Sequence, residues 1–396
     1  MPALLTFEEA LACVLERAEP LASEAVPLSE AGGRVLAEGA AARVDLPPFP
    51  SSAMDGFAVR AEDTPGELPV VARIAAGRPS AAALPAGSAA AIATGGAVPE
   101  GANAVVPIER VTVRDDRVEL PEPAQPGQHI RPRGGDVRDG AVVAAAGTRL
   151  GPVHIGALAA AGIPEVSCSV RPRVAVLATG SELRAPGEPL AFGQIYESNR
   201  AMVATVLAAA GATIEQLPVV EDEKDAHREA LERALAADVV VTSGGVSMGP
   251  HDLVRAVAAE LGVEEVFWGV AVKPGKPLSF GVRGPTLVFG LPGNPVSSLV
   301  GSLLFVRPAL LARQGADPGP SFETGRVAGA LRRNAQRDEF VRARRRGGED
   351  GILLEPVTGQ ESHMIVRASS ADALVHVPRG TGELAAGEPV RYLVLA

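Results

Sequence analysis

The 396-residue chain has few aromatic residues, few cysteines and no excess of positive charge. Phe, Trp and Tyr make up only 3% of it, so its cores must be built from Ala, Val and Leu. This scarcity makes base stacking on aromatic platforms an unexpected main activity. The chain carries 37 basic and 47 acidic residues, a net charge of −10, which argues against a general nucleic-acid binder.

Cysteine is limited to Cys13 and Cys168, which form no Cys-x-x-Cys spacing. We therefore expect no disulfide framework and no structural zinc, as in a reducing cytoplasm. Near the N-terminus, Glu8 and Glu9 occupy positions where a signal peptide would carry basic residues. No apolar run is judged long enough to approach the ~20 residues of a membrane helix, so we expect a cytoplasmic protein without a membrane contact.

The length predicts two to four domains at about 100–200 residues each. A helix is expected from Thr6, which forms a capping-box pattern with Glu9. Residues 46–139 are rich in Pro and Gly and contain only short apolar runs, which predicts a β-rich module.

Apolar strands alternate with amphipathic helices over residues 171–312. This pattern predicts an α/β domain with a mostly parallel sheet covered on both faces, with ligands at the carboxyl ends of the strands. After Pro318 and Pro320 the chain alternates in short strands, which predicts a small β-barrel or sandwich.

A carboxylate follows each of three predicted strands: Glu182, Asp222 and Asp252. If these strands are neighbours, the three side chains converge on one rim of the sheet, and such oxygen ligands suit Mg²⁺ paired with substrate phosphates. The alternative, weighed equally on spacing alone, is that the acids cap helix N-termini.

Three further loops carry residues suited to anions, although each is also compatible with a purely structural turn. Ser243-Gly-Gly-Val-Ser247 lets backbone N–H groups approach a ligand, and Gly290-Leu-Pro-Gly-Asn-Pro295 places Asn294 at a helix start. Lys273-Pro-Gly-Lys276-Pro holds two ammonium groups beside a turn. The six histidines show no metal-ligand spacing, and we assign them no metal.

Six segments in this order resemble the molybdopterin molybdenumtransferase family, which includes the C-terminal half of gephyrin. They are Pro47–Ala58, Thr94–Val106, Ile130–Asp136, Ser243–Gly249, Lys273–Pro277 and Gly290–Ser297. The resemblance covers essentially the whole chain.

The resemblance implies a homodimer with four domains per chain. These are a split domain (1–45 with 140–170), an inserted β-rich domain (46–139), an α/β molybdopterin-binding domain (171–312) and a C-terminal β-barrel (318–396). The implied reaction inserts molybdate into adenylyl-molybdopterin and releases AMP, with Mg²⁺. The implied cleft lies between the α/β domain of one subunit and the inserted domain of the other, and molybdopterin adenylyltransferase is an implied protein partner.

The resemblance also implies roles for individual residues. The catalytic set is Asp55, Thr94, Glu182, Asp222, Asp252 and Lys273, of which Glu182, Asp222 and Asp252 would hold the metal. The substrate-binding set is Asp136, Ser243, Gly244, Gly245, Ser247, Lys276, Pro292, Gly293, Asn294, Arg342 and Ser362.

Two positions depart from the family pattern. Phe267-Trp268 is followed by Gly269, where some members have a lysine, so Lys273 or Lys276 must supply that charge. The functional acid after the second strand is Asp222, or Glu221 if the match slips by one residue. Two other functions stay open: a molybdopterin adenylyltransferase, similar to residues 171–312 only, and a non-catalytic scaffold. Tungstate stays open beside molybdate.

Overall fold

The computed structural model describes residues 4–246, 253–348 and 351–395. The chain forms two compact units, Met1–Glu24 with Ser169–Ala396, and Ala25–Cys168. It passes between them at β1 (Ser23–Pro27) and β12 (Glu165–Ser169), which pair with each other.

The α/β part of the first unit is a six-stranded sheet. The pairings among the first four strands are parallel, and the fifth strand in the order runs antiparallel to both of its neighbours, which confirms the predicted mostly parallel sheet. In spatial order they are β16 (Thr213–Gln216), β13 (Arg173–Ala178), β17 (Val239–Ser243), β21 (Thr286–Leu291), β20 (Ser279–Arg283) and β18 (Glu264–Trp268).

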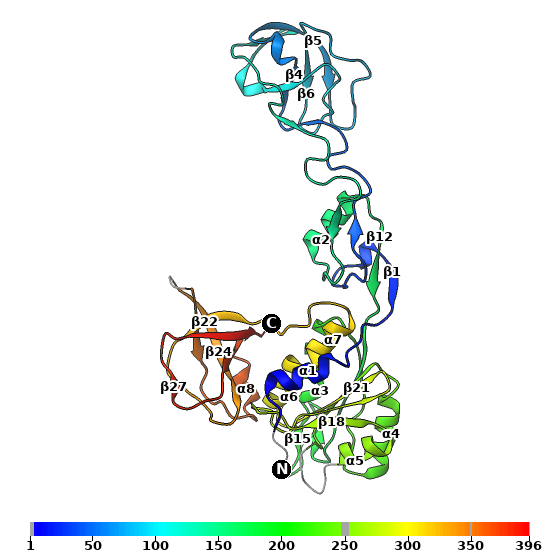
Figure 1. Cartoon of the computed structure of the whole chain (residues 1–396), viewed down its shortest axis with the longest axis vertical. Coiled ribbons are helices and arrows are strands. Elements are labelled where there is room, and N and C mark those ends of the chain that lie inside the picture. The colour runs from blue at the N-terminus through cyan, green and yellow to red at the C-terminus, as the bar shows by residue number, and fades with distance from the viewer. Residues whose placement is uncertain (1–3, 247–252, 349–350, 396) are drawn as a thin grey trace. The chain divides into compact units, whose positions relative to one another are not determined.

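Helices cover both faces of this sheet, so its central strands are apolar on both sides (Figure 1). Along β17, Val239 and Val241 join one core while Val240 joins the other. The first face packs against α3 (Asn199–Ala209), α6 (Pro295–Gly301) and α7 (Arg307–Arg313), and the second against α4 (Lys224–Ala234) and α5 (Leu253–Glu260).

Helix α6 continues through a π-helical turn, η4 (Ser302–Val306), into α7. This 19-residue segment has a mean hydropathy of 1.5, which by length and composition is enough to cross a membrane. The sequence-based judgement that no such run exists was therefore wrong. Because 67% of its 18-residue window is buried inside the protein and Phe305 is fully covered, the segment serves here as a core helix.

Helix α1 (Phe7–Leu15) begins with the predicted capping box between Thr6 and Glu9. Its buried residue Phe7 contacts Phe305 and Phe340 edge-on, at centroid distances of 5.8 and 5.7 Å. The helix thus belongs to the first unit. Spacing identified an apolar stripe on this helix but not the surface that the stripe covers.

The C-terminal segment closes into a five-stranded barrel, which confirms the barrel and removes the sandwich alternative (Figure 1). In order around the barrel the strands are β24 (Asp338–Gly348), β25 (Gly351–Pro356), β22 (Glu323–Val327), β28 (Pro389–Val394) and β26 (Ala373–Val377). A short strand from the α/β part, β19 (Val272–Lys273), pairs with β24.

The second unit holds the predicted β-rich module, a six-stranded sheet. Its strands, in spatial order, are β7 (Ala104–Pro107), β4 (Gly56–Val59), β6 (Ala89–Ile92), β5 (Gly66–Ile74), β9 (Arg117–Leu120) and β8 (Thr112–Arg114). A separate apolar cluster gathers around Leu36, Leu150 and Leu158, the last from α2 (Pro152–Ala160). The four-domain boundaries stay a prediction.

Short elements complete the described chain. They are η1 (Leu28–Glu30), β2 (Ala40–Ala41), β3 (Ser51–Ser52), η2 (Ala61–Asp63), η3 (Ile108–Arg110), β10 (Ile130–Arg131), β11 (Val142–Ala144), β14 (Leu183–Arg184), β15 (Ile195–Tyr196), β23 (Leu331–Arg332), α8 (Ile365–Ala368) and β27 (Glu383–Leu384).

Candidate functional site

A crevice opens where the order of the parallel strands reverses. From β13 the chain runs through α3 to β16 on one side of β13, and then through α4 to β17 on the other side. The connections that leave the carboxyl ends of β13 and β17 therefore diverge, and such points are the usual ligand sites of open α/β sheets.

The loops at this point line a cavity of about 370 Å³, which we name the carboxylate cavity. Glu182 and Asp222 both line it, so these two predicted acids lie at one rim of the sheet. The described residues around it include no Lys and no Arg; besides the two acids they are Thr179, Gly180, Gly244, Gly245, Val246, Pro277, Pro292, Gly293 and Asn294.

Reciprocal hydrogen bonds hold the two acidic loops together. The Ser181 backbone N–H donates to Asp222 Oδ2 at 3.2 Å, and the Asp222 N–H donates to Ser181 Oγ at 3.1 Å. Glu221, the alternative acid, lines a different cavity with α4 residues. The geometry therefore favours Asp222 as the acid of this crevice.

Two glycines bring the Ser243 loop close to the β13 loop. Gly244 has φ +94°, and a Cβ on it would lie 2.6 Å from the Thr179 carbonyl oxygen. Gly245 has φ +67° and leaves no room beside Val254. These positions thus require glycine whether or not a ligand binds. Of the predicted site residues, Ser247 and Asp252 lie outside the described residues.

Ser243 is buried at the end of β17 and belongs to a polar network rather than an open surface. The Asn199 amide Nδ2 donates to Ser243 Oγ at 2.8 Å and to the Gly293 carbonyl at 2.7 Å. Ser298 Oγ lies 3.1 Å from Ser243 Oγ. Asn199, which the sequence did not single out, therefore ties the loop after β17 to the loop after β21.

A second cavity, of about 540 Å³, shares Thr179, Glu182, Gly293 and Asn294 with the carboxylate cavity. We name it the α3 cavity, because residues 197–199 at the start of α3 line it. Its other polar lining residues include Ser243 and His363.

The predicted Pro292-Gly293-Asn294 loop lines the carboxylate cavity. Asn294 stands at the N-cap of α6 with Pro295 in the first turn, as expected, but its side chain makes no capping hydrogen bond. The Val296 N–H of α6 donates instead to the Ser362 carbonyl at 3.0 Å. Ser362 thus contacts the helix start through its backbone.

Arg342 was predicted to bind the substrate, but its guanidinium is turned inward and only 1% of the residue is exposed. It donates to the carbonyl oxygens of Gly359 (2.7 Å), Glu361 (3.2 Å) and Met364 (3.1 Å). Burial in the barrel lowers the pKa of this guanidinium from its usual value. Arg342 therefore supports the loop that carries Ser362 and His363 and has no surface left for a substrate.

Neither predicted lysine lines the two cavities. Lys273 Nζ lies 3.0 Å from Glu339 Oε1 on the barrel, and its side chain is 50% exposed. Lys276 is exposed beside Pro277, a lining residue of the carboxylate cavity. Gly269 has φ +88°, a backbone conformation that disfavours a lysine at this position.

In the second unit, Asp55 and Thr94 come together at the ends of β4 and β6. Thr94 donates to Asp55 Oδ1 through its backbone N–H (2.6 Å) and its hydroxyl (2.9 Å). Both hydrogen bonds lower the pKa of Asp55 below its usual value, and the bond from the backbone N–H has the larger effect. Gly56 is obligatory here, because a Cβ would lie 2.1 Å from the Val106 carbonyl.

Asp136 is exposed, and its backbone N–H donates to the Leu46 carbonyl at 2.9 Å. Its segment follows β10, which pairs with β3 just before Asp55. Asp136 and Asp55 thus stand on neighbouring segments, and no side-chain contact joins them in the described part of the unit.

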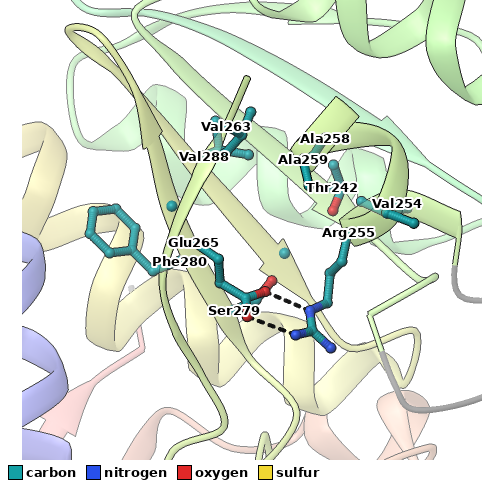
Figure 2. A pocket seen from close by; sticks show the side chains of 13 residues that line it. Thr242, Val254, Arg255, Ala258, Ala259, Val263, Glu265, Ser279, Phe280 and Val288 are labelled. Carbon is teal, nitrogen blue, oxygen red and sulfur yellow. Dashed lines mark hydrogen bonds and ion pairs between the residues drawn. The ribbon is translucent and has the colours of Figure 1, made fainter. Parts of the chain in front are cut away.

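A third cavity, of about 450 Å³, lies beneath α5 on the other face of the sheet. Figure 2 shows Arg255 and Glu265 meeting at it, with two N–O distances of 2.6 and 2.7 Å. Small side chains such as Ala258 and Gly281 create the space. Neither acid of the carboxylate cavity lines it, so we do not place the site there.

The donor set of the carboxylate cavity suits a hard cation, since carboxylate oxygens from Glu182 and Asp222 face one space. Across residues 4–246, 253–348 and 351–395, no group of three or more His, Cys, Asp or Glu stands ready for a metal. A bound ion would therefore need substrate or water oxygens to complete its coordination.

The Asp55–Thr94 contact gives a direct prediction. In Thr94→Val the hydroxyl donor is lost while the backbone N–H remains, so the pKa of Asp55 should rise and still stay below its usual value. Stability from this contact is present above the unfolded-state pKa and is lost as pH falls through the folded-state pKa. NMR titration of the Asp55 carboxyl carbon measures the shift; an unchanged pKa would contradict the assigned cause.

Three family descriptions match the chain end to end. They are "MoeA N-terminal region (domain I and II)" at residues 5–162, "Probable molybdopterin binding domain" at 175–312 and "MoeA C-terminal region (domain IV)" at 324–395.

Curated and structural relatives cover nearly the full length. Molybdopterin molybdenumtransferase of Haemophilus influenzae is 36% identical over 395 residues, 98% of each chain. Molybdopterin molybdenumtransferase 2 of Mycobacterium tuberculosis is 38% identical over 385 residues, 91% of this chain and 92% of that one. The crystal structure of the molybdopterin biosynthesis MoeA protein from Pyrococcus horikoshii OT3 superposes with a TM-score of 0.86 at 31% identity, over 99% and 100% of the chains. This chain belongs to the molybdopterin molybdenumtransferase family.

Proposed function

We propose that this protein inserts molybdenum from molybdate into adenylylated molybdopterin and releases AMP. The observation that carries the proposal is the carboxylate cavity, where Glu182 and Asp222 meet at the switch point of a sheet of this family. The adenylyltransferase alternative is similar to residues 171–312 only, whereas relatives named molybdenumtransferases match 91–98% of the chain.

Glu182 and Asp222 are the residues that would hold Mg²⁺. A divalent ion supplies charge neutralisation for a phosphoanhydride and for its developing negative charge. The protein's own need for such charge is clear, because the described lining of both cavities contains carboxylates but neither Lys nor Arg. A pyrophosphate brought there without a cation would meet like charge on the protein.

The chain's own groups position the reacting parts. Thr179, Gly244 and Gly245 narrow the crevice around the substrate, and the Ser181–Asp222 hydrogen bonds fix the direction of the Asp222 carboxylate. Lys276 offers an exposed ammonium next to Pro277, where it would attract the molybdate dianion. The substrate's dithiolene sulfurs take the metal, and water cleaves the phosphoanhydride, so no protein nucleophile is required.

Asp55 and Thr94 belong to the same proposal as a second functional pair. The hydrogen bonds from Thr94 favour the ionised form of Asp55 and lower its pKa, as suits an acceptor or cation ligand. The proposal also includes a reducing, cytoplasmic location, supported by the scarcity of cysteine, which is limited to Cys13 and Cys168. We also propose that an adenylyltransferase delivers the adenylylated substrate to this protein.

A homodimer is supported by the outer surface of α2. Apart from His154 this helix is apolar, yet Leu158 is its only buried residue and Val153 is 82% exposed. Apolar helices are ordinarily buried, and Gly156, Ala157 and Ala160 leave the exposed face shallow enough for close packing. A second copy of α2 is the occupant that we propose.

Catalysis tests the functional proposal directly. In Asp222→Asn, purified with Mg²⁺ and molybdate, AMP release from adenylyl-molybdopterin should fall about 100-fold or more, since a fixed charge aimed at the reacting phosphates is lost. Glu221→Gln is the matched control, because it removes the neighbouring charge outside the cavity and should stay within about twofold of the wild-type rate.

Wild-type protein that binds the substrate but releases no AMP upon adding molybdate would favour the scaffold alternative. Equal losses in both variants would contradict the assignment of Asp222. Tungstate in parallel ranks the two oxyanions.

The dimer is tested by Val153→Glu, which places a charge in the proposed helix contact. We expect the wild type to sediment at twice the chain mass and the variant at the chain mass of 40.4 kDa. Val71→Glu, at a 52% exposed position elsewhere in the second unit, serves as the control. A variant that remains dimeric would place the interface elsewhere.

A further inference from the structure

The wall of the α3 cavity is rich in hydrogen-bond acceptors. Glu197 lines it from the chain just before α3, and it is only 5% exposed. Asn199 lines it two residues later and is 8% exposed. Glu182 contributes another carboxylate from the opposite loop.

Asn199 has an acceptor that the protein itself does not use. Its Nδ2 is engaged by Ser243 and Gly293, which fixes the amide orientation and leaves Oδ1 buried with no partner among the described residues. A buried acceptor without a donor costs about 1–3 kcal/mol. Because the protein keeps this unused Asn199 oxygen next to a cavity, we expect a ligand to donate a hydrogen bond to it.

The start of α3 is not an anion site here. The N-terminal N–H of Arg200 already donates to Glu197 Oε1 at 2.8 Å, so a carboxylate of the protein occupies the positive end of the helix. Arg200 Nε lies 3.6 Å from Glu197 Oε2 and partly offsets its charge, but Arg200 does not line the cavity, so a phosphate there would still meet the Glu182 carboxylate. The polar wall instead suits a neutral group that donates N–H bonds.

The remaining walls suit a flat ring. Leu183, Ile195, Tyr196 and Ile365 line the cavity together with Pro295, and the Tyr196 hydroxyl is held by the Glu188 carbonyl at 2.9 Å. A volume of about 540 Å³ accommodates a bicyclic heterocycle with room for its substituent. Ile365 is carried by the barrel loop that Arg342 supports.

We propose that the α3 cavity binds the amino-pyrimidinone edge of the substrate's pterin, with Glu197 and Asn199 accepting hydrogen bonds from its ring N–H and exocyclic amine. This inference rests on the proposed function and assigns one part of its substrate. The pyrophosphate then lies in the adjoining carboxylate cavity, which shares Glu182 and Asn294 with the pterin subsite.

The substrate edge can be changed without touching the protein. Wild-type protein is titrated with pterin and with lumazine, in which a carbonyl acceptor replaces the exocyclic amine, and binding is followed by ligand-observed NMR. Pterin should bind at least tenfold more tightly than lumazine, because the lumazine carbonyl oxygen would face the acceptor oxygens of Glu197 and Asn199. Equal affinity, or a preference for lumazine, would overturn the proposal.

The protein side is tested with Glu197→Gln, which can still accept the Arg200 N–H but presents a donor in place of the second oxygen and loses that oxygen's ion pair with the Arg200 guanidinium. We expect pterin affinity to fall about 10–100-fold and AMP affinity to stay unchanged. In turnover, KM should rise with little change in kcat, as for a lost ground-state contact. Glu188→Gln, outside both cavities, is the matched control and should behave as wild type.

The outcomes separate this inference from the function on which it rests. Weaker AMP binding with unchanged pterin binding in Glu197→Gln would assign the cavity to adenine and overturn the proposal. An active wild type whose Glu197→Gln variant keeps the wild-type KM would also overturn it. Loss of AMP release in the wild type, with pterin binding still dependent on Glu197, would contradict the proposed function alone.

Discussion

The crevice exists because the chain leaves β13 on one side and adds β17 on the other. Two parallel strands that stay adjacent must then send their following loops apart, and space remains between the loops. Every feature of the candidate site depends on this divergence. The Ser181–Asp222 hydrogen bonds close one end of the crevice, and Asn199 ties its other loops together. Gly244 allows those loops to approach within contact distance of Thr179.

Charge is the second constraint on the site. The protein is acidic overall, and the described crevice concentrates carboxylates without a lysine or arginine among its lining residues. Lys273 forms an ion pair with Glu339, and the Arg342 guanidinium donates its hydrogen bonds to carbonyl oxygens of the barrel loop. An anionic substrate can enter such a space only with compensating positive charge, and a divalent cation supplies two positive charges in a small volume.

Much of the architecture could be predicted from local pattern. The capping box at Thr6, the parallel strands of the α/β part and the β-rich C-terminal segment all follow from periodicity and from the placement of Gly and Pro. These features depend on residues that are close in sequence, so a single chain carries the information. The placement of Glu182 and Asp222 at one rim follows from strand parallelism in the same way.

Other features depend on long-range packing that spacing does not encode. An arginine in a run of basic residues is usually a surface residue, and the burial of Arg342 becomes visible only with the loop 359–364 around it. The stripe on α1 could have packed on any core, and the α6–α7 helix is apolar enough to resemble a membrane span. Glu197 and Asn199 escaped notice because a short polar segment before a helix ordinarily indicates a cap; only the cavity reveals the unused acceptor.

The crevice is proposed to bind phosphate groups through a cation held by carboxylates rather than through fixed basic side chains. Calorimetric titration of AMP into the protein, with Mg²⁺ and then with EDTA, tests it most directly. We expect measurable AMP binding with Mg²⁺, and loss of that binding both in EDTA and in the Asp222→Asn variant. If AMP binds equally well with Mg²⁺ and with EDTA, the carboxylates do not bind phosphate through a cation.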